Sequence, residues 1–106
     1  MPLADKKLSG LLGIAMRAGQ VVLGSDMVLQ EVRKRKAALV ILDAAASENT
    51  AKVFHDKCTY YGIPVFTLEA EALDRALGQS GRIVAAVRKG GFAQQIIKLI
   101  PTDENP

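Results

Sequence analysis

Residues 20–42, QVVLGSDMVLQEVRKRKAALVIL, decide the fold. The apolar run at 20–23 is typical of a short strand, and the glycine that follows it supplies a turn. Ser25 comes directly after Gly24, where its side-chain oxygen can accept the hydrogen bond that opens a helix. The sequence therefore predicts a strand, a glycine turn and a helix in immediate succession.

The predicted helix has one apolar side and ends in a run of cations. Its inward positions are Val28, Leu29 and Val32. The cations of RKRK at 33–36 complement the negative end of the helix dipole, so charge and helix direction agree. Residues 38–42 are then apolar throughout and partly β-branched, which is typical of a strand covered on both faces.

The rest of the chain continues this alternation. A helix at 5–17 precedes the quoted stretch, and its Gly10 and Gly13 would let a neighbouring segment approach the backbone closely. Downstream we expect a helix capped by Ser47 and running to Tyr61, a strand at 65–68, a helix at 69–77 closed by Gly78, a strand at 83–87 and a helix at 92–100. Four strands among five helices predict the α/β class: a single-domain three-layer α/β/α sandwich with a mixed four-stranded sheet.

Size and composition agree with one folded domain. Of the 106 residues, 49% are hydrophobic and 24% are charged, so a disordered chain is excluded. We expect the domain to cover residues 1–100 and an acidic tail to follow at 101–106. One cysteine cannot form an internal disulfide, the first residues do not read as a secretory signal, and no stretch reaches membrane-spanning length. These features predict a cytoplasmic protein that does not bind membranes.

Charge is distributed unevenly along the chain. The net charge is +3, but residues 1–36 carry +4, residues 37–74 carry −4 and residues 75–100 carry +5. Basic segments therefore flank an acidic middle. Such clustering favours binding to a polyanion, whereas an even distribution of the same charge would only aid solubility.

No residue pattern predicts catalysis, a metal site or a cofactor. Cys58, the only thiol, lies on an apolar helical side with Phe54 and Tyr61, while His55, the only imidazole, falls toward the polar edge. A buried Cys58 is therefore preferred to a thiol enzyme. Glycine-rich phosphate loops are absent. Three carboxylates match no acid–base or metal motif and are expected to be solvated: Asp43, Glu48 and Asp56.

Two features bear on nucleic-acid binding. The two tyrosines and three phenylalanines do not alternate with basic residues, so no stacking platform for single-stranded RNA is expected. The turn at Gly24, by contrast, presents backbone N–H groups at the positive end of a helix dipole, where a phosphate oxygen can bind. A generic helix cap would account for the same residues. Four side chains are expected on the polar side of this helix: Asp26, Met27, Gln30 and Lys34.

A longer stretch resembles a known family. Residues 18–50, followed by YYGIPVF at 60–66, LDRALG at 73–78 and RIVAAV at 82–87, resemble the kink-turn RNA-binding ribosomal protein superfamily, the archaeal ribosomal protein seven-Ae family. Within it, they resemble the small bacterial YlxQ-type proteins. The resemblance covers about residues 5–100 and implies an α/β/α sandwich that binds RNA and is not an enzyme.

The resemblance assigns an RNA-binding role to the glycine turn. In the superfamily, the residues after the turn glycine read sheared G·A pairs and the backbone of a kinked duplex. Gly24 and Ser25 match that pattern. Asp26 brings a negative charge toward phosphates, Met27 removes a hydrogen-bonding group, and Gln30 stands where the family has a cation. We therefore expect structured RNA to be bound with relaxed kink-turn specificity.

The loop before the last strand, residues 82–85, corresponds to the family's apolar surface for an extruded nucleotide. The expected RNA-facing edge consists of Gly24, Ser25, Asp26, Met27, Gln30, Lys34, Arg82, Ile83 and Val84. Structured RNA is the implied partner, with ribosomal RNA, the ribosome and translation factors as candidates, and we expect a monomer. The alternative is a protein-interaction module of the translation apparatus that has kept the fold and lost the RNA contacts.

Overall fold

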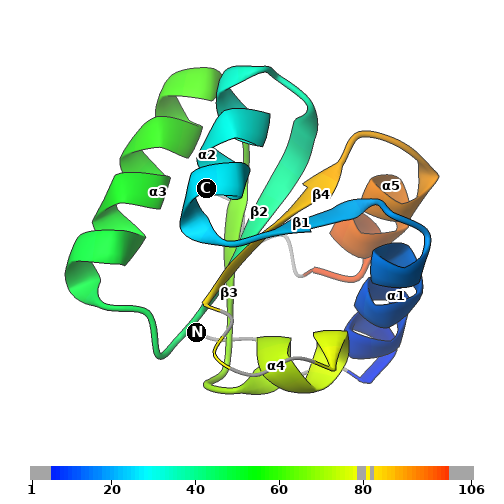
Figure 1. The fold of residues 1–106 in the computed structure, drawn as a ribbon. Helices are drawn as coiled ribbons and strands as arrows, with labels where there is room; N and C mark the ends of the chain where they lie inside the picture. The colour runs from blue at the N-terminus through cyan, green and yellow to red at the C-terminus, as the bar shows by residue number, and fades with distance from the viewer. Residues whose placement is uncertain (1–5, 79–80, 82, 101–106) are drawn as a thin grey trace.

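The computed structural model describes residues 6–78, 81 and 83–100, which form a mixed four-stranded sheet with helices on both faces (Figure 1). The elements in chain order are α1 (Lys6–Arg17), β1 (Val21–Leu23), α2 (Ser25–Arg33), β2 (Ala37–Asp43), α3 (Glu48–Tyr61), β3 (Val65–Leu68), α4 (Ala72–Leu77), β4 (Val84–Arg88) and α5 (Gly91–Lys98). The expected α/β/α sandwich and its mixed sheet are confirmed.

The strand order in the sheet is β1-β4-β2-β3. Here β4 is antiparallel to both β1 and β2, whereas β2 and β3 are parallel. Successive residues of β2 face opposite layers: Leu39 and Ile41 pack in one core cluster, and Val40 and Leu42 in the other. The prediction that this strand is covered on both faces is confirmed.

One face of the sheet is covered by α2 and α3, and the other by α1, α4 and α5 (Figure 1). The glycines of α1 differ in their surroundings. A Cβ added at Gly13 would lie 3.0 Å from the carbonyl oxygen of Ala76, so α4 packs closely on the backbone there. A Cβ added at Gly10 would meet no atom within 4 Å. The expected close approach therefore holds at Gly13 alone.

The start of α2 differs from the expectation. Its first residue is Ser25, and the N-cap is Gly24, with φ 89° and ψ 145°. No side chain makes a capping hydrogen bond, so the assignment of Ser25 as the cap is wrong. The tight passage from β1 into α2 requires a positive φ at the cap position, which glycine adopts and serine rarely does.

Other boundaries also shift. The helix expected from residue 69 begins at Ala72, because Glu71 adopts a left-handed conformation with φ 68°. The N–H group of Glu71 donates to the Asp43 carboxylate at 2.9 Å, across 28 residues of sequence. A contact between residues so far apart in the sequence cannot be predicted from local sequence patterns. The last strand begins at residue 84, one residue later than expected, and the last helix covers residues 91–98.

Alanine at position 24 should destabilise the protein, because a side chain is strained at φ 89°. We expect Gly24→Ala to lower the free energy of unfolding by about 1–3 kcal/mol. Gly10 is the matched control: it lies on the exposed side of α1, and Gly10→Ala should raise stability by about 0.5–1 kcal/mol. Urea denaturation measures both effects. Equal effects of the two substitutions would contradict the requirement for glycine at the turn.

Cys58 is completely buried beside Phe54, as the helical pattern predicts. Burial raises the pKa of its thiol from 9.0 to about 11. The native protein therefore holds the thiol proton more tightly than the unfolded chain does. The stability contributed by this difference is complete below about pH 9 and is lost as the pH rises through about 11.

Cys58→Ala should cost about 1–2 kcal/mol of stability at pH 7, since it leaves a small cavity in the core. The stability difference between wild type and this variant should shrink as the pH rises from about 9 to about 11, because only the wild type has a buried thiol to deprotonate. Urea titrations across this pH range measure the difference. Rapid labelling of the native thiol by a bulky reagent at neutral pH would refute the buried position.

Candidate nucleic-acid interface

The turn between β1 and α2 is hydrogen-bonded to the start of β4. The N–H group of Gly24 donates to the carbonyl of Val84 at 3.4 Å, and the carbonyl of Gly24 accepts from the N–H group of Val28 at 2.9 Å. The first bond joins the turn to β4, and the second begins the helix. Two segments singled out in the sequence, the glycine turn and the loop before the last strand, therefore lie side by side.

The first turn of α2 is open to solvent. Ser25, Asp26 and Met27 are all exposed. Their backbone N–H groups lie in the first turn, where no carbonyl of the same helix is available to them. No side chain caps this end either. The arrangement gives a group of donors at the positive end of the helix dipole, where an anionic oxygen can bind.

The expected polar side of α2 is divided between two places. Met27, whose exposed fraction is 50%, and Gln30 lie about one turn apart on the solvent side, near the glycine turn. Lys34 is the C-cap residue, nine positions beyond Ser25 and therefore about 14 Å along the helix axis. The structure thus brings Met27 and Gln30 to the candidate edge and places Lys34 at the other end of the helix.

The loop before β4 contributes less than expected. Val84 has an exposed fraction of 0% and packs in the core between the sheet and the α2–α3 layer, so its side chain is wrongly assigned to the RNA-facing edge. It begins an interior strand, and only its backbone carbonyl serves the edge, by holding Gly24. Ile83 is partly exposed and packs against the same cluster. Arg82 lies outside the described residues.

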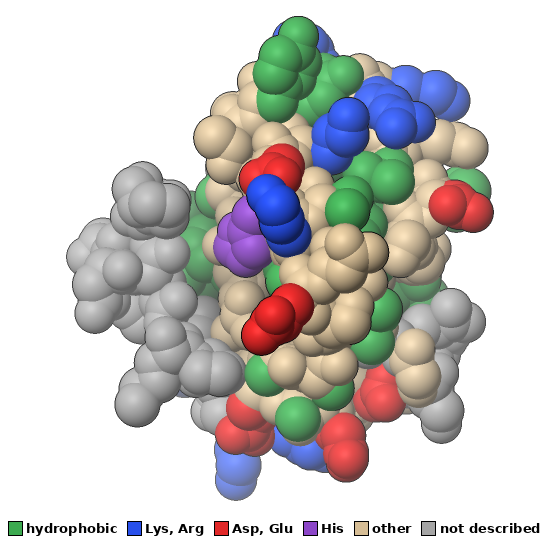
Figure 2. Space-filling model, turned by 90° about the vertical axis from the view of Figure 1, so that its left-hand side faces the viewer, with side chains coloured by type: hydrophobic (Ala, Val, Ile, Leu, Met, Phe, Trp, Pro, Cys, Tyr) green, Lys and Arg blue, Asp and Glu red, His purple; other side chains and the backbone are tan. Residues whose placement is uncertain are grey.

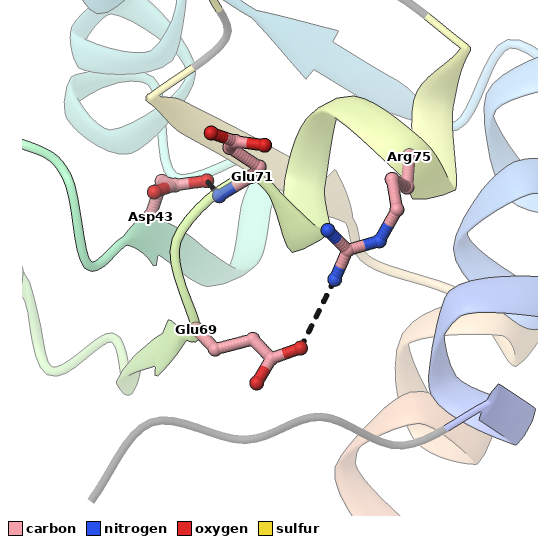
Figure 3. A network of polar contacts seen from close by, with 4 residues as sticks. All are labelled: Asp43, Glu69, Glu71 and Arg75. Carbon is pink, nitrogen blue, oxygen red and sulfur yellow. Dashed lines mark hydrogen bonds and ion pairs between the residues drawn. The ribbon is translucent and has the colours of Figure 1, made fainter.

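Asp43 ties several segments together at this end of the sheet. Its Oδ1 accepts from the N–H group of Ala45 at 2.8 Å, and its Oδ2 accepts from the N–H group of Glu71 at 2.9 Å (Figure 3). The N–H group of Asp43 itself donates to the carbonyl of Ile83 at 2.8 Å. The carboxylate of Asp43 therefore holds the segments of Ala45 and Glu71, and its backbone joins them to the loop that carries Ile83.

The expectation of a solvated carboxylate is wrong for Asp43, which is 3% exposed. The sequence signal that could have identified it is an acid directly after a fully apolar strand. Such a strand lies inside the sheet, and neighbouring loops cover its last residue. Figure 3 also shows Arg75 and Glu69, which form an exposed ion pair of 3.0 Å. Solvent screens that pair, so it contributes little to stability.

Within the described residues, no group of three or more His, Cys, Asp and Glu side chains is placed to hold a metal ion. Cys58 is buried, whereas His55 is exposed, so the thiol and the imidazole do not form one site. No helix in the part of the chain that the structure describes is long and apolar enough to cross a membrane.

Known proteins resemble this chain in sequence and in fold. RNA-binding protein YlxQ from Bacillus subtilis (strain 168) is 47% identical over 91 residues, which are 85% of this chain and 91% of that protein. The structure of a protein with unknown function from Bacillus halodurans C is 36% identical, with a TM-score of 0.84 over 90% of this chain and 97% of the other. The Giardia lamblia 15.5kD RNA binding protein is 26% identical, with a TM-score of 0.73 over 94% of this chain and 92% of the other.

A family profile also matches, and it covers both segments of the candidate edge. The matched residues are 6–97, which include the Gly24 turn and the whole of β4. The resemblance seen in the sequence is therefore confirmed: the chain belongs to the ribosomal protein L7Ae/L30e/S12e/Gadd45 family.

Proposed function

We propose that this protein binds structured RNA along the edge formed by the Gly24 turn and Ile83. The observation that carries the proposal is the hydrogen bond from Gly24 to Val84, which holds the open N-terminus of α2 beside the loop before β4. Support comes from two relatives named as RNA-binding proteins, which are 47% and 26% identical to this chain. The proposed role is non-enzymatic and needs no cofactor.

The residues of this edge divide between phosphate and base contacts. The backbone N–H groups of residues 25–27 bind a phosphate oxygen, and Gly24 lets the RNA backbone approach because nothing lies within 4 Å of the place where its Cβ would be. Ile83 offers apolar surface to an unstacked base. Phosphate contacts fix the position of the RNA, and base contacts select it.

We propose weak discrimination between a kink-turn and a plain duplex, because three exposed side chains of α2 depart from the family pattern. Asp26 repels phosphates, and Met27 presents no hydrogen-bonding group to a base edge. Gln30 is neutral where the family has a cation. The expected setting is the cytoplasm, with ribosomal RNA or another structured RNA of the translation apparatus as the ligand of a monomeric protein.

A second candidate function is a protein-interaction module of the translation apparatus. The half-exposed Met27 favours it, since methionine is enriched in protein–protein interfaces. This role would use the same edge without an RNA ligand. RNA binding and its salt dependence separate the two candidates.

RNA affinity should fall steeply with salt, because bound phosphates displace counterions from the RNA. With about four phosphate contacts, the slope of log K against log salt concentration should be near −3. Fluorescence anisotropy with a labelled structured RNA at rising salt measures it. Binding with a slope near zero would exclude an interface based on phosphates.

Restoring the family pattern should restore discrimination. The triple variant Asp26→Asn, Met27→Glu, Gln30→Lys regains a base-edge acceptor and a cation and removes a repelling charge. Each regained base contact contributes about 1–3 kcal/mol on the scale of bidentate base contacts. The ratio of kink-turn to duplex affinity should therefore rise about tenfold or more over wild type, in a paired assay with both RNAs.

A matched control makes the same changes elsewhere on the surface. Glu69→Gln, Ile14→Glu and Gln94→Lys, all at exposed positions outside α2 and outside the hollow beside Tyr60, alter net charge by the same amount. This control should not change the affinity ratio. Strong kink-turn preference in wild type would refute relaxed specificity. If the triple variant binds neither RNA, the edge is not an RNA site and the protein-interaction role is favoured.

A further inference from the structure

A second surface lies at the opposite end of the sheet from Gly24, where α2 and α3 end and β2 begins (Figure 1). We name it the basic–aromatic surface, and it consists of Arg35, Lys36, Tyr60, Tyr61 and Lys89. Two hollows of about 440 and 260 Å³ run along it, and Arg35 and Lys89 line both. Tyr61 lines the smaller of these and also a neighbouring hollow of about 370 Å³, which reaches Tyr60. The surface is therefore continuous.

The cations of this surface are not neutralised. Arg35, Lys36 and Lys89 form no ion pair with any residue that the structure describes. Glu31, which lies nearby but is 6% exposed, is bound by Arg88 at 2.6 Å, so these two charges cancel. Figure 2, which faces α3, shows Lys and Arg side chains gathered at its upper end beside hydrophobic side chains. A net positive charge therefore faces solvent here.

Two aromatic rings adjoin these cations. The rings of Tyr60 and Tyr61 meet edge to face with centroids 5.0 Å apart, and the guanidinium of Arg35 lies over the Tyr61 ring at 5.2 Å. Arg35 is held in a left-handed conformation with φ 60°. Tyr60 is 79% exposed, which leaves its ring free for a further contact. Aromatic and basic residues do not alternate along the sequence, but the packing of α2 against α3 brings Arg35 and Tyr61 together from distant parts of it.

We propose that the basic–aromatic surface binds single-stranded RNA, with phosphates on Lys36 and Lys89 and a base stacked on Tyr60. A basic groove beside an exposed ring is the combination by which proteins hold single strands without sequence preference. An acidic peptide would use the cations but would gain little from the ring. The proposal rests on the proposed function in one respect: the single-stranded segment is a flank of the RNA held at the Gly24 edge, which lies one length of β2 or about 20 Å away.

The ring is tested with a fluorescently labelled oligouridine of ten nucleotides. Tyr60→Ala should weaken its binding about tenfold, whereas Tyr60→Phe, which keeps the ring, should bind like wild type. The high exposure of Tyr60 means that both variants should fold, which thermal unfolding checks. Equal affinity of wild type and Tyr60→Ala would overturn the stacking contact and with it the proposal.

The cations are tested by the salt dependence of the same binding. The double variant Lys36→Gln, Lys89→Gln should make the slope of log K against log salt less negative by about 1.4, because two phosphate contacts are lost. The control Lys6→Gln, Lys98→Gln removes two exposed lysines from α1 and α5, and its slope should equal that of wild type. Equal slopes for both double variants would overturn the proposal.

Two further measurements separate this surface from the Gly24 edge and from a protein site. Tyr60→Ala should bind a structured RNA without single-stranded flanks as tightly as wild type does. If wild type binds oligouridine but does not bind this structured RNA, the proposed function at the Gly24 edge is rejected and the proposal for this surface stands. A polyglutamate peptide of equal charge should bind far more weakly than oligouridine. If the peptide binds as tightly and Tyr60→Ala affects neither ligand, the surface binds acidic protein and the RNA proposal is wrong.

Discussion

Burial of β2 on both faces is the constraint on which the rest of the structure depends. The strand lies between β4 and β3, and six of its seven residues are buried. No polar group can function along such a strand, so polar chemistry is confined to its two ends, about 20 Å apart. One end lies beside the Gly24 turn and Ile83, and the other follows Arg35 and Lys36. The fold thus separates two exposed surfaces by one buried strand.

A buried carboxylate stabilises each of these two ends, and the two carboxylates have different partners. Asp43 accepts hydrogen bonds from the backbone N–H groups of Ala45 and Glu71, whereas Glu31 pairs with Arg88. Burial of a charge is tolerated only with such partners, so each carboxylate fixes the segments that supply its donors. Both acids are thereby removed from the surface. At the basic end, the cations that remain exposed determine the local field.

Local patterns predicted the features that depend on neighbouring residues. Ser47 caps α3 by accepting a hydrogen bond from the N–H group of Thr50, as expected from its position. Features that depend on distant residues were not predictable: Asp43 acts across 28 residues on Glu71, and Arg35 meets Tyr61 only once two helices pack. For the candidate edge, the burial of Val84 could have been predicted, because the strand that begins at residue 84 is apolar on both faces, the pattern of a covered strand. Its side chain was assigned to the edge by the family resemblance and not by this pattern.

The N-terminus of α2 shows how helix stability and RNA binding compete for the same groups. The positive φ of Gly24 excludes a serine or aspartate cap, and the carboxylate of Asp26 in the first turn compensates by about 0.3–1 kcal/mol through the helix dipole. A phosphate in the proposed complex would occupy the same positive end and would be repelled by that carboxylate. Stabilising the free helix thus weakens its phosphate site. In the proposed complex, selection of the RNA would then depend more on the apolar surface of Ile83 than on the helix terminus.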